Sequence, residues 1–156
     1  MTKSILFVCL GNICRSPAAE AIFLKQTIEK GLEDKFKVDS AGTGAWHVGN
    51  KADSRMREAA SKRGINITSR ARQIKLNDFQ IFDFILTMDN SNLKDVNKLF
   101  ENVDNKKAIV IKPILSYSTH PNLIEVPDPY YGGENGFDEV LDLLEDSING
   151  LLLTIN

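Results

Sequence analysis

An apolar run at residues 5–8 leads directly into the polar segment Cys-Leu-Gly-Asn-Ile-Cys-Arg-Ser-Pro at 9–17. The run predicts a short buried strand, and Ser16 followed by Pro17 predicts the N-cap and first residue of a helix. A strand that passes through a short loop into a helix favours an α/β fold, provided that the rest of the chain continues the alternation.

The alternation does continue along the chain. Strand-like runs at 36–40, 82–88 and 108–111 alternate with helical patterns at 18–30, 52–63 and 92–100, and a last helix is predicted from about residue 136. This order predicts an α/β fold with three layers, in which an open, mainly four-stranded parallel sheet has helices on both faces. Because no repeat or linker divides the 156 residues, we expect a single domain at 1–156.

The loop after the first strand has the composition of an anion-binding site. Gly11 and Asn12 tolerate backbone conformations that let amides turn toward a phosphate-like group, and the helix start adds partial positive charge. Arg15 supplies a planar fork for two oxygens of a tetrahedral oxyanion. The same field favours the thiolate form of Cys9, which would be a nucleophile for phosphoryl transfer. We expect the site at the carboxyl end of the first strand, where crevices of open parallel sheets lie.

Cleavage of a phosphate ester also requires a proton for the leaving oxygen. The long segment at 113–136 contains Val-Pro-Asp-Pro-Tyr-Tyr at 126–131, in which prolines on both sides stiffen the backbone around Asp128. Taken alone, this is an ordinary surface turn. Beside a cysteine loop that needs an acid, it favours Asp128 as the general acid.

Composition excludes several other classes of protein. Two cysteines, both in one loop, cannot form a disulfide framework and are too few for a structural zinc site. We also expect no metal or cofactor, because the loop and Arg15 supply the positive field that phosphoryl transfer needs. A net charge of −2 argues against nucleic-acid binding, and the lack of a long apolar run or signal peptide predicts a cytoplasmic protein that does not bind membranes.

Charge is unevenly distributed along the sequence. Residues 55–75 contain seven basic residues and one acid, whereas 125–146 contain eight acids and no Lys or Arg. Either these are two solvated faces that pair with each other, or the basic face docks acidic or phosphorylated partners.

Together these segments resemble the low-molecular-weight protein tyrosine phosphatases. The resemblance rests on the segments at 8–17 and 128–131, on Trp46, and on the segments at 39–43, 71–74 and 88–93, and so spans nearly the whole chain. It implies strand order 2-1-3-4 and a cysteine-dependent, metal-independent phosphoric monoester hydrolase. Such an enzyme hydrolyses phosphotyrosine in proteins, and small aryl phosphates, through a cysteinyl-phosphate intermediate. Its product is inorganic phosphate, and we expect a monomer or weak dimer.

The resemblance also assigns roles to individual residues. Cys9 would be the nucleophile, Arg15 the phosphate clamp and Asp128 the general acid, while Ser16 would bind the Cys9 sulfur. Asn12 and Ser40 would brace the loop. The other substrate-binding or phosphate-binding positions that it implies are the loop residues Leu10, Gly11, Ile13 and Cys14, the aromatic walls Trp46 and Tyr130, and Tyr131 at the rim.

Cys14 has two interpretations. The resemblance suggests a reversible disulfide with Cys9 that would protect the nucleophile from overoxidation. The alternative is a small apolar side chain beneath the loop.

The chain departs from many eukaryotic members of the family at Ser69, which stands where they have a histidine that supports the loop. We therefore expect some loss of loop rigidity without loss of chemistry. His47 and His120 are expected to be surface residues, since neither lies in a recognisable triad or ligand spacing.

Several rival functions share parts of this pattern. An arsenate reductase of the same fold needs further cysteines outside the loop, and this chain has none. A protein-arginine phosphatase tends to have Thr where Ile13 stands. A phosphotyrosine-binding or redox-sensing module without turnover would lack the acid at Asp128. A thiol-disulfide oxidoreductase would have two residues between its cysteines, whereas four separate Cys9 and Cys14.

Overall fold

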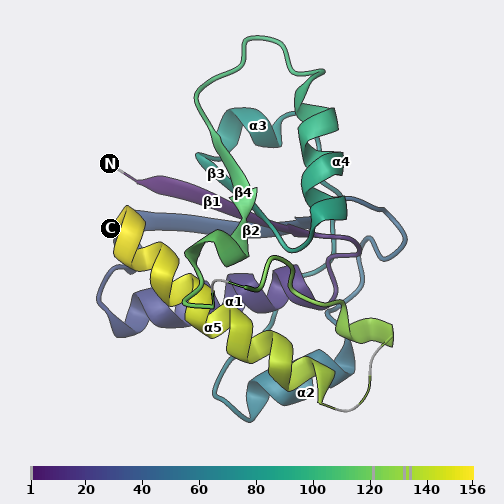
Figure 1. Cartoon of the computed structure of the whole chain (residues 1–156), viewed down its shortest axis with the longest axis vertical. Helices are drawn as coiled ribbons and strands as arrows, with labels where there is room; N and C mark the ends of the chain where they lie inside the picture. The colour runs from purple at the N-terminus through teal and green to yellow at the C-terminus, as the bar shows by residue number, and fades with distance from the viewer. Residues whose placement is uncertain (1, 121, 132, 134) are drawn as a thin grey trace.

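The computed structural model describes residues 2–120, 122–131, 133 and 135–156, and shows one open sheet between two groups of helices (Figure 1). The sheet contains β1 (Lys3–Cys9), β2 (Phe36–Gly42), β3 (Phe84–Thr87) and β4 (Val110–Pro113). All neighbouring strands are parallel and their order is β2-β1-β3-β4, as expected. Their carboxyl ends therefore meet at a single edge of the sheet.

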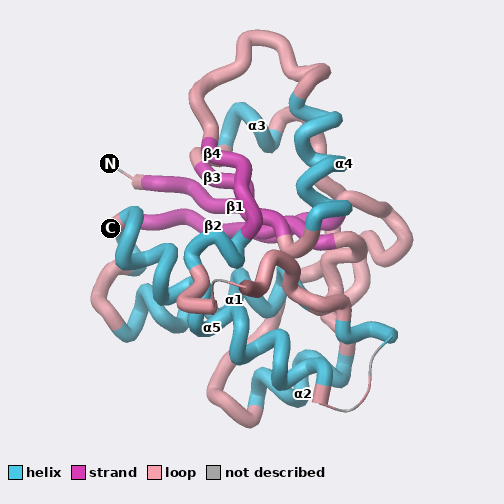
Figure 2. The backbone as a smooth tube through the Cα atoms, in the orientation of Figure 1, coloured by secondary structure: helices cyan, strands magenta, loops and turns pink. Residues whose placement is uncertain are grey.

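Helices cover both faces of this sheet (Figure 2). One side carries α1 (Arg15–Glu29), α2 (Ser54–Ser61) and α5 (Gly136–Ile155), and the other carries α3 (Asp78–Ile81) and α4 (Asn90–Phe100). Short 3₁₀ turns occur at η1 (Glu33–Lys35), η2 (Ile114–Tyr117) and η3 (Pro129–Tyr131). The predicted three-layer α/β fold is confirmed.

The central strand β1 shows why the core has two parts. Because successive side chains of a strand point to opposite faces, Ile5 and Phe7 pack with α1 and α5, while Leu6 and Val8 pack with α3 and α4. All four side chains are fully buried, as expected of a parallel strand covered on both faces. Cys9 continues the first of these faces and ends the strand at the site.

Helix boundaries differ from the predictions at specific residues. The interpretation of Ser16 as the N-cap is wrong, because α1 already begins at Arg15 with Cys14 in the cap position, and the Ser16 hydroxyl binds loop atoms instead. Pro17 is the third helical residue. Proline has no N–H there, and none is needed, because the first four N–H groups of an α-helix have no partner within the helix. The predicted end at Gly31 is confirmed: its φ is +67°, and the next amide donates to the carbonyl of Thr27 at 2.8 Å.

Two further elements lie where the sequence did not place them. Helix α3 was not predicted, and β4 ends at Pro113 rather than at 111. Proline is tolerated there because β4 is an edge strand, with a single neighbour in the sheet. In the described residues, no helix has the length and apolar character needed to span a membrane.

Candidate active site

Cys9 lies at the carboxyl end of β1, and its sulfur is enclosed by the loop that follows. The backbone amide of Asn12 donates to Sγ at 3.3 Å, and the Ser16 hydroxyl lies 3.0 Å from it. Asn12 adopts a φ of +58°, a left-handed conformation that asparagine tolerates, and this turns its amide back toward the sulfur. The loop thus directs hydrogen-bond donors at the sulfur from the positive end of α1.

The side chain of Asn12 ties this loop to two other segments. Its Nδ2 donates to Ser16 Oγ at 2.7 Å and to Ser40 Oγ at 3.0 Å, and its Oδ1 accepts from the Arg72 amide at 2.9 Å. Ser40 in turn donates to Glu20 at 2.6 Å. The predicted contact between Asn12 and Ser40 is therefore present. The chain has Ser69 in place of the supporting histidine, and the backbone amide of Arg72 supports the Asn12 side chain.

Arg15 is almost entirely buried, yet its guanidinium reaches the same cleft. Its Nη1 donates to Asp89 Oδ2 at 2.7 Å and to the carbonyl oxygen of Val126 at 3.1 Å. Asp89 also caps α4 by accepting from the Asn92 amide at 2.8 Å, so its carboxylate is fixed at the end of β3. A cation held on these partners is preorganised to receive a tetrahedral anion.

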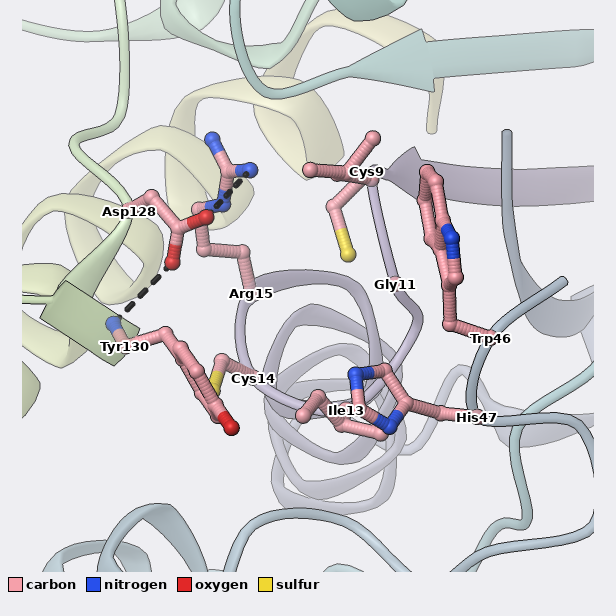
Figure 3. A pocket seen from close by; sticks show the side chains of 10 residues that line it. Cys9, Gly11, Ile13, Cys14, Arg15, Trp46, His47, Asp128 and Tyr130 are labelled. Atoms are coloured by element: carbon pink, nitrogen blue, oxygen red, sulfur yellow. Dashed lines mark hydrogen bonds and ion pairs between the residues drawn. The ribbon is translucent and has the colours of Figure 1, made fainter. Parts of the chain in front are cut away.

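Asp128 approaches from the long segment after β4. Its Oδ2 lies 3.6 Å from Arg15 Nη2, and its Oδ1 accepts from the Tyr130 amide at 3.0 Å (Figure 3). The backbone just before it is fixed, because the Val126 amide donates to the Met88 carbonyl at 2.8 Å. About a third of the Asp128 side chain is exposed, so its carboxyl group is accessible to water and to a ligand in the cleft.

A cleft of about 270 Å³ joins these groups, with Tyr130 and Trp46 on opposite sides (Figure 3). The Trp46 indole lies over Gly44, where a Cβ atom would come within 1.8 Å of the ring. His47 also lines the cleft, with its ring centroid 6.3 Å from that of Tyr130. The expectation that His47 is merely a surface residue is therefore wrong: its loop folds over the site.

Most of the other predicted residues also line this cleft. Leu10, Gly11, Ile13 and Cys14 do so directly. The side chain of Tyr131 lies outside the described part of the structure. Among the described residues, no group of three or more His, Cys, Asp or Glu side chains could hold a metal ion.

Cys14 is a free, buried thiol beneath the loop. Burial, reinforced by the nearby Asp53 carboxylate, raises the pKa of Cys14 far above its usual value. The side chain is thus held as a neutral thiol at physiological pH, and its disulfide with Cys9 stays a prediction.

Sequence reasoning missed two contacts of Arg15, those with Asp89 and the Val126 carbonyl. Asp89 carried a usable signal, since an aspartate between a strand and a helical pattern is a typical N-cap. The hydrogen bond from Arg15 to the Val126 carbonyl, 111 positions away, could not be predicted, because a backbone carbonyl belongs to every residue type.

Comparisons with known proteins agree with this geometry. The profile of the low-molecular-weight phosphotyrosine protein phosphatases matches residues 4–156. The chain belongs to this family. The phosphatase is 44% identical over 159 residues to the low-molecular-weight phosphotyrosine protein phosphatase of Schizosaccharomyces pombe, which covers 99% of each chain.

Solved structures extend the similarity to the fold. A protein tyrosine phosphatase of Entamoeba histolytica superimposes with a TM-score of 0.90 at 43% identity, covering 99% of this chain and 97% of the other. A Drosophila arginine phosphatase gives a TM-score of 0.91 at 33% identity, covering 96% and 95%. The phosphatase is thus a cysteine-dependent phosphotyrosine phosphatase in fold and family.

Proposed function

We propose that Cys9, Arg15 and Asp128 carry out phosphotyrosine hydrolysis in this cleft. The observation that carries the proposal is their convergence: a sulfur that faces loop amides, a buried guanidinium and a partly exposed carboxyl group share a cleft with aromatic walls. The loop after β1 supplies Cys9 and Arg15, the segment after β4 supplies Asp128 and Tyr130, and the loop after β2 supplies Trp46. Convergence of a nucleophile, an oxyanion binder and an acid is what phosphoryl transfer needs.

The reaction would run in two steps. The loop amides and Arg15 hold the substrate phosphate, and the Cys9 thiolate attacks phosphorus in line with the ester oxygen. The P–O bond breaks as Asp128 donates its proton to the leaving phenolate, which leaves a cysteinyl phosphate. Asp128, now a carboxylate, takes a proton from water, which attacks phosphorus. The S–P bond then breaks, inorganic phosphate leaves and the thiolate returns, while the Ser16 hydroxyl 3.0 Å away stabilises the departing sulfur.

Asp128 is assigned as the acid rather than Asp89 because of their surroundings. Asp89 is bound by Arg15 at 2.7 Å and by an α4 amide, whereas Asp128 lines the cleft and lies 3.6 Å from the guanidinium. Cys9→Ser should abolish hydrolysis of p-nitrophenyl phosphate while phosphate binding survives. Asp128→Asn should lower kcat by about 10²-fold to 10⁴-fold for poor leaving groups and far less for good ones.

The matched comparison is Asp89→Asn. This variant loosens Arg15, so it should slow all leaving groups to a similar extent. A steep leaving-group dependence in Asp89→Asn together with a flat one in Asp128→Asn would reverse the assignment. Retained turnover in Cys9→Ser would refute the covalent mechanism.

The similarity to an arginine phosphatase makes phosphoarginine the second substrate to test. The apolar Ile13 and the two aromatic walls favour a flat aryl group over a guanidino group. We expect kcat/KM to be higher for a phosphotyrosine peptide than for the matching phosphoarginine and phosphoserine peptides. A higher kcat/KM for the phosphoarginine peptide would instead identify phosphoarginine as the preferred substrate.

We also propose that the phosphatase acts in the cytoplasm, as a monomer or weak dimer. A nucleophilic thiol must stay reduced, and both of its cysteines are free, as suits a reducing compartment. Fractionation of cells and sedimentation of the purified chain test the two statements separately.

A further inference from the structure

Four of the eight basic side chains between residues 51 and 75 are neutralised by carboxylates. Arg63 binds Asp138, Asp142 and Glu145 of α5 at 2.8–3.1 Å, so at this point the basic and acidic stretches do pair with each other. Further ion pairs join Arg72 to Asp39 and Asp78, Arg55 to Asp53, and Lys62 to Glu58. Over the described residues, the cations of this segment without a carboxylate oxygen within 4.0 Å are Lys51, Arg57, Arg70 and Lys75.

Lys51 and Arg70 lie side by side. They are partners in an isolated antiparallel bridge, and the amides of Gly49 and Ala71 each make a 2.8 Å hydrogen bond across it. Residues paired in this way have Cβ atoms about 4.5–5.5 Å apart, and like charges there repel. The two exposed cations are thus held next to each other by the backbone, with no carboxylate of the described chain against them.

Side-chain contacts concentrate further positive charge at this place. The Arg70 guanidinium donates to the Gly49 carbonyl at 3.1 Å, and Arg57 Nε donates to the Ala52 carbonyl at 2.9 Å. The nearest carboxylate in sequence, Asp53, is engaged by Arg55 at 2.8 Å and by the first turn of α2. We call Lys51 and Arg70 the basic rim.

The basic rim is fixed to one wall of the cleft. The Asn50 amide donates to the His47 carbonyl at 2.9 Å, and His47 and Trp46 line the cleft. An extended peptide advances about 3.3–3.6 Å per residue. Residues two to four positions from a phosphotyrosine in the cleft therefore lie within reach of long side chains on the rim.

We propose that the basic rim binds Asp and Glu side chains that flank the phosphotyrosine of a protein substrate. This inference rests on the proposed function of the cleft. A carboxylate placed between Lys51 and Arg70 relieves their mutual repulsion and gains charge-assisted hydrogen bonds from both. Because the site is exposed, its contribution is modest and decreases with salt. The surface therefore selects among phosphotyrosine substrates without taking part in the chemistry.

The test compares two phosphotyrosine peptides of equal length, one with Glu and one with Gln at the positions two to four residues on either side. The measured quantity is the ratio of their kcat/KM values, at low and at high NaCl concentration. We expect the wild type to prefer the Glu peptide about threefold to tenfold at low salt, and the double variant Lys51→Gln with Arg70→Gln to lose this preference.

The matched control is the double variant Lys37→Gln with Lys98→Gln. It removes the same net charge from exposed positions, at the start of β2 and in the last turn of α4, away from the edge where the strands end. This control should keep the wild-type ratio. Equal loss in both double variants would mean that only net charge matters, and would overturn the proposal.

Two other results would also overturn it. One is an unchanged ratio in the Lys51 and Arg70 variant. The other is a preference that appears only when the flanking residues are phosphoserine, which would assign the rim to a second phosphate. A wild type that fails to hydrolyse p-nitrophenyl phosphate would instead refute the proposed function, so the two failures are distinguishable.

Discussion

Replacement of Asn12 by alanine removes the hydrogen bonds that brace the loop after β1. The side chain is 2% exposed and makes the hydrogen bonds to Ser16, Ser40 and the Arg72 amide, at 2.7–3.0 Å. At about 1 kcal/mol for each bond, the three contribute about 3 kcal/mol. Alanine also adopts the φ of +58° poorly, which adds about 1 kcal/mol, so we expect a loss of about 4 kcal/mol.

The assay is urea unfolding at neutral pH, combined with kcat/KM on p-nitrophenyl phosphate. Asn12→Gly is the matched comparison, because glycine accepts the left-handed conformation and lacks the same hydrogen bonds. The difference between the two variants should therefore isolate the backbone strain. In both variants the factor by which kcat/KM falls should exceed the factor by which KM rises, which means that kcat falls as well. The reason is that the loop amide that faces Cys9 Sγ at 3.3 Å loses its alignment.

A double-mutant cycle with Ser40→Ala tests whether the bonds act as a network. Ser40 accepts from Asn12 and donates to Glu20, so we expect the two substitutions to be coupled by about 1 kcal/mol. Strictly additive losses, or a cost below about 1 kcal/mol for Asn12→Ala, would refute the reasoning.

Three further predictions follow from other parts of the fold. Gly44→Ala should displace the Trp46 indole, because a Cβ at position 44 would come within 1.8 Å of the ring. Gly44→Ala and Trp46→Ala should both raise KM for aryl phosphates, and an unchanged KM in Gly44→Ala would contradict this. The hydrogen bond from Arg55 is the main cause that lowers the pKa of Asp53 below 3.8, so its stabilisation is present above about pH 3.8 and is lost as pH falls through the folded-state pKa. Asp53→Asn should therefore flatten the acid side of the urea-midpoint profile. Phe23→Ala should cost about 3–5 kcal/mol in urea unfolding, because the ring is 1% exposed and packs edge-on against Phe7 and Phe36.

Sequence patterning predicted the layers of the fold because β1 is apolar on both faces and the last helix repeats its apolar residues at helical spacing. It failed at α3, whose four residues at Asp78–Ile81 are too few to show a helical period. It also misplaced the helix start at Ser16, since the side chain that usually caps a helix here binds Asn12. Tertiary contacts at the site outweighed the local preference.

The sequence predicted those site residues that lie close together in one segment. Cys9 and Arg15 belong to one short loop, and the need for an acid directed attention to Asp128. His47 was misjudged because its position depends on how the loop after β2 folds over the cleft. No local sequence pattern predicts the backbone path of this loop. None predicts the bridge between Lys51 and Arg70 either.

The contacts of Arg15 also have a consequence for the newly synthesised chain. The guanidinium is held by Asp89 and by the Val126 carbonyl, 74 and 111 positions further along the sequence. These contacts of Arg15 therefore cannot be completed until nearly the whole protein has left the ribosome, and a partly made chain carries Cys9 without the fixed guanidinium beside it. Because distant contacts form slowly, recovery of activity after dilution from urea should lag behind recovery of helix content.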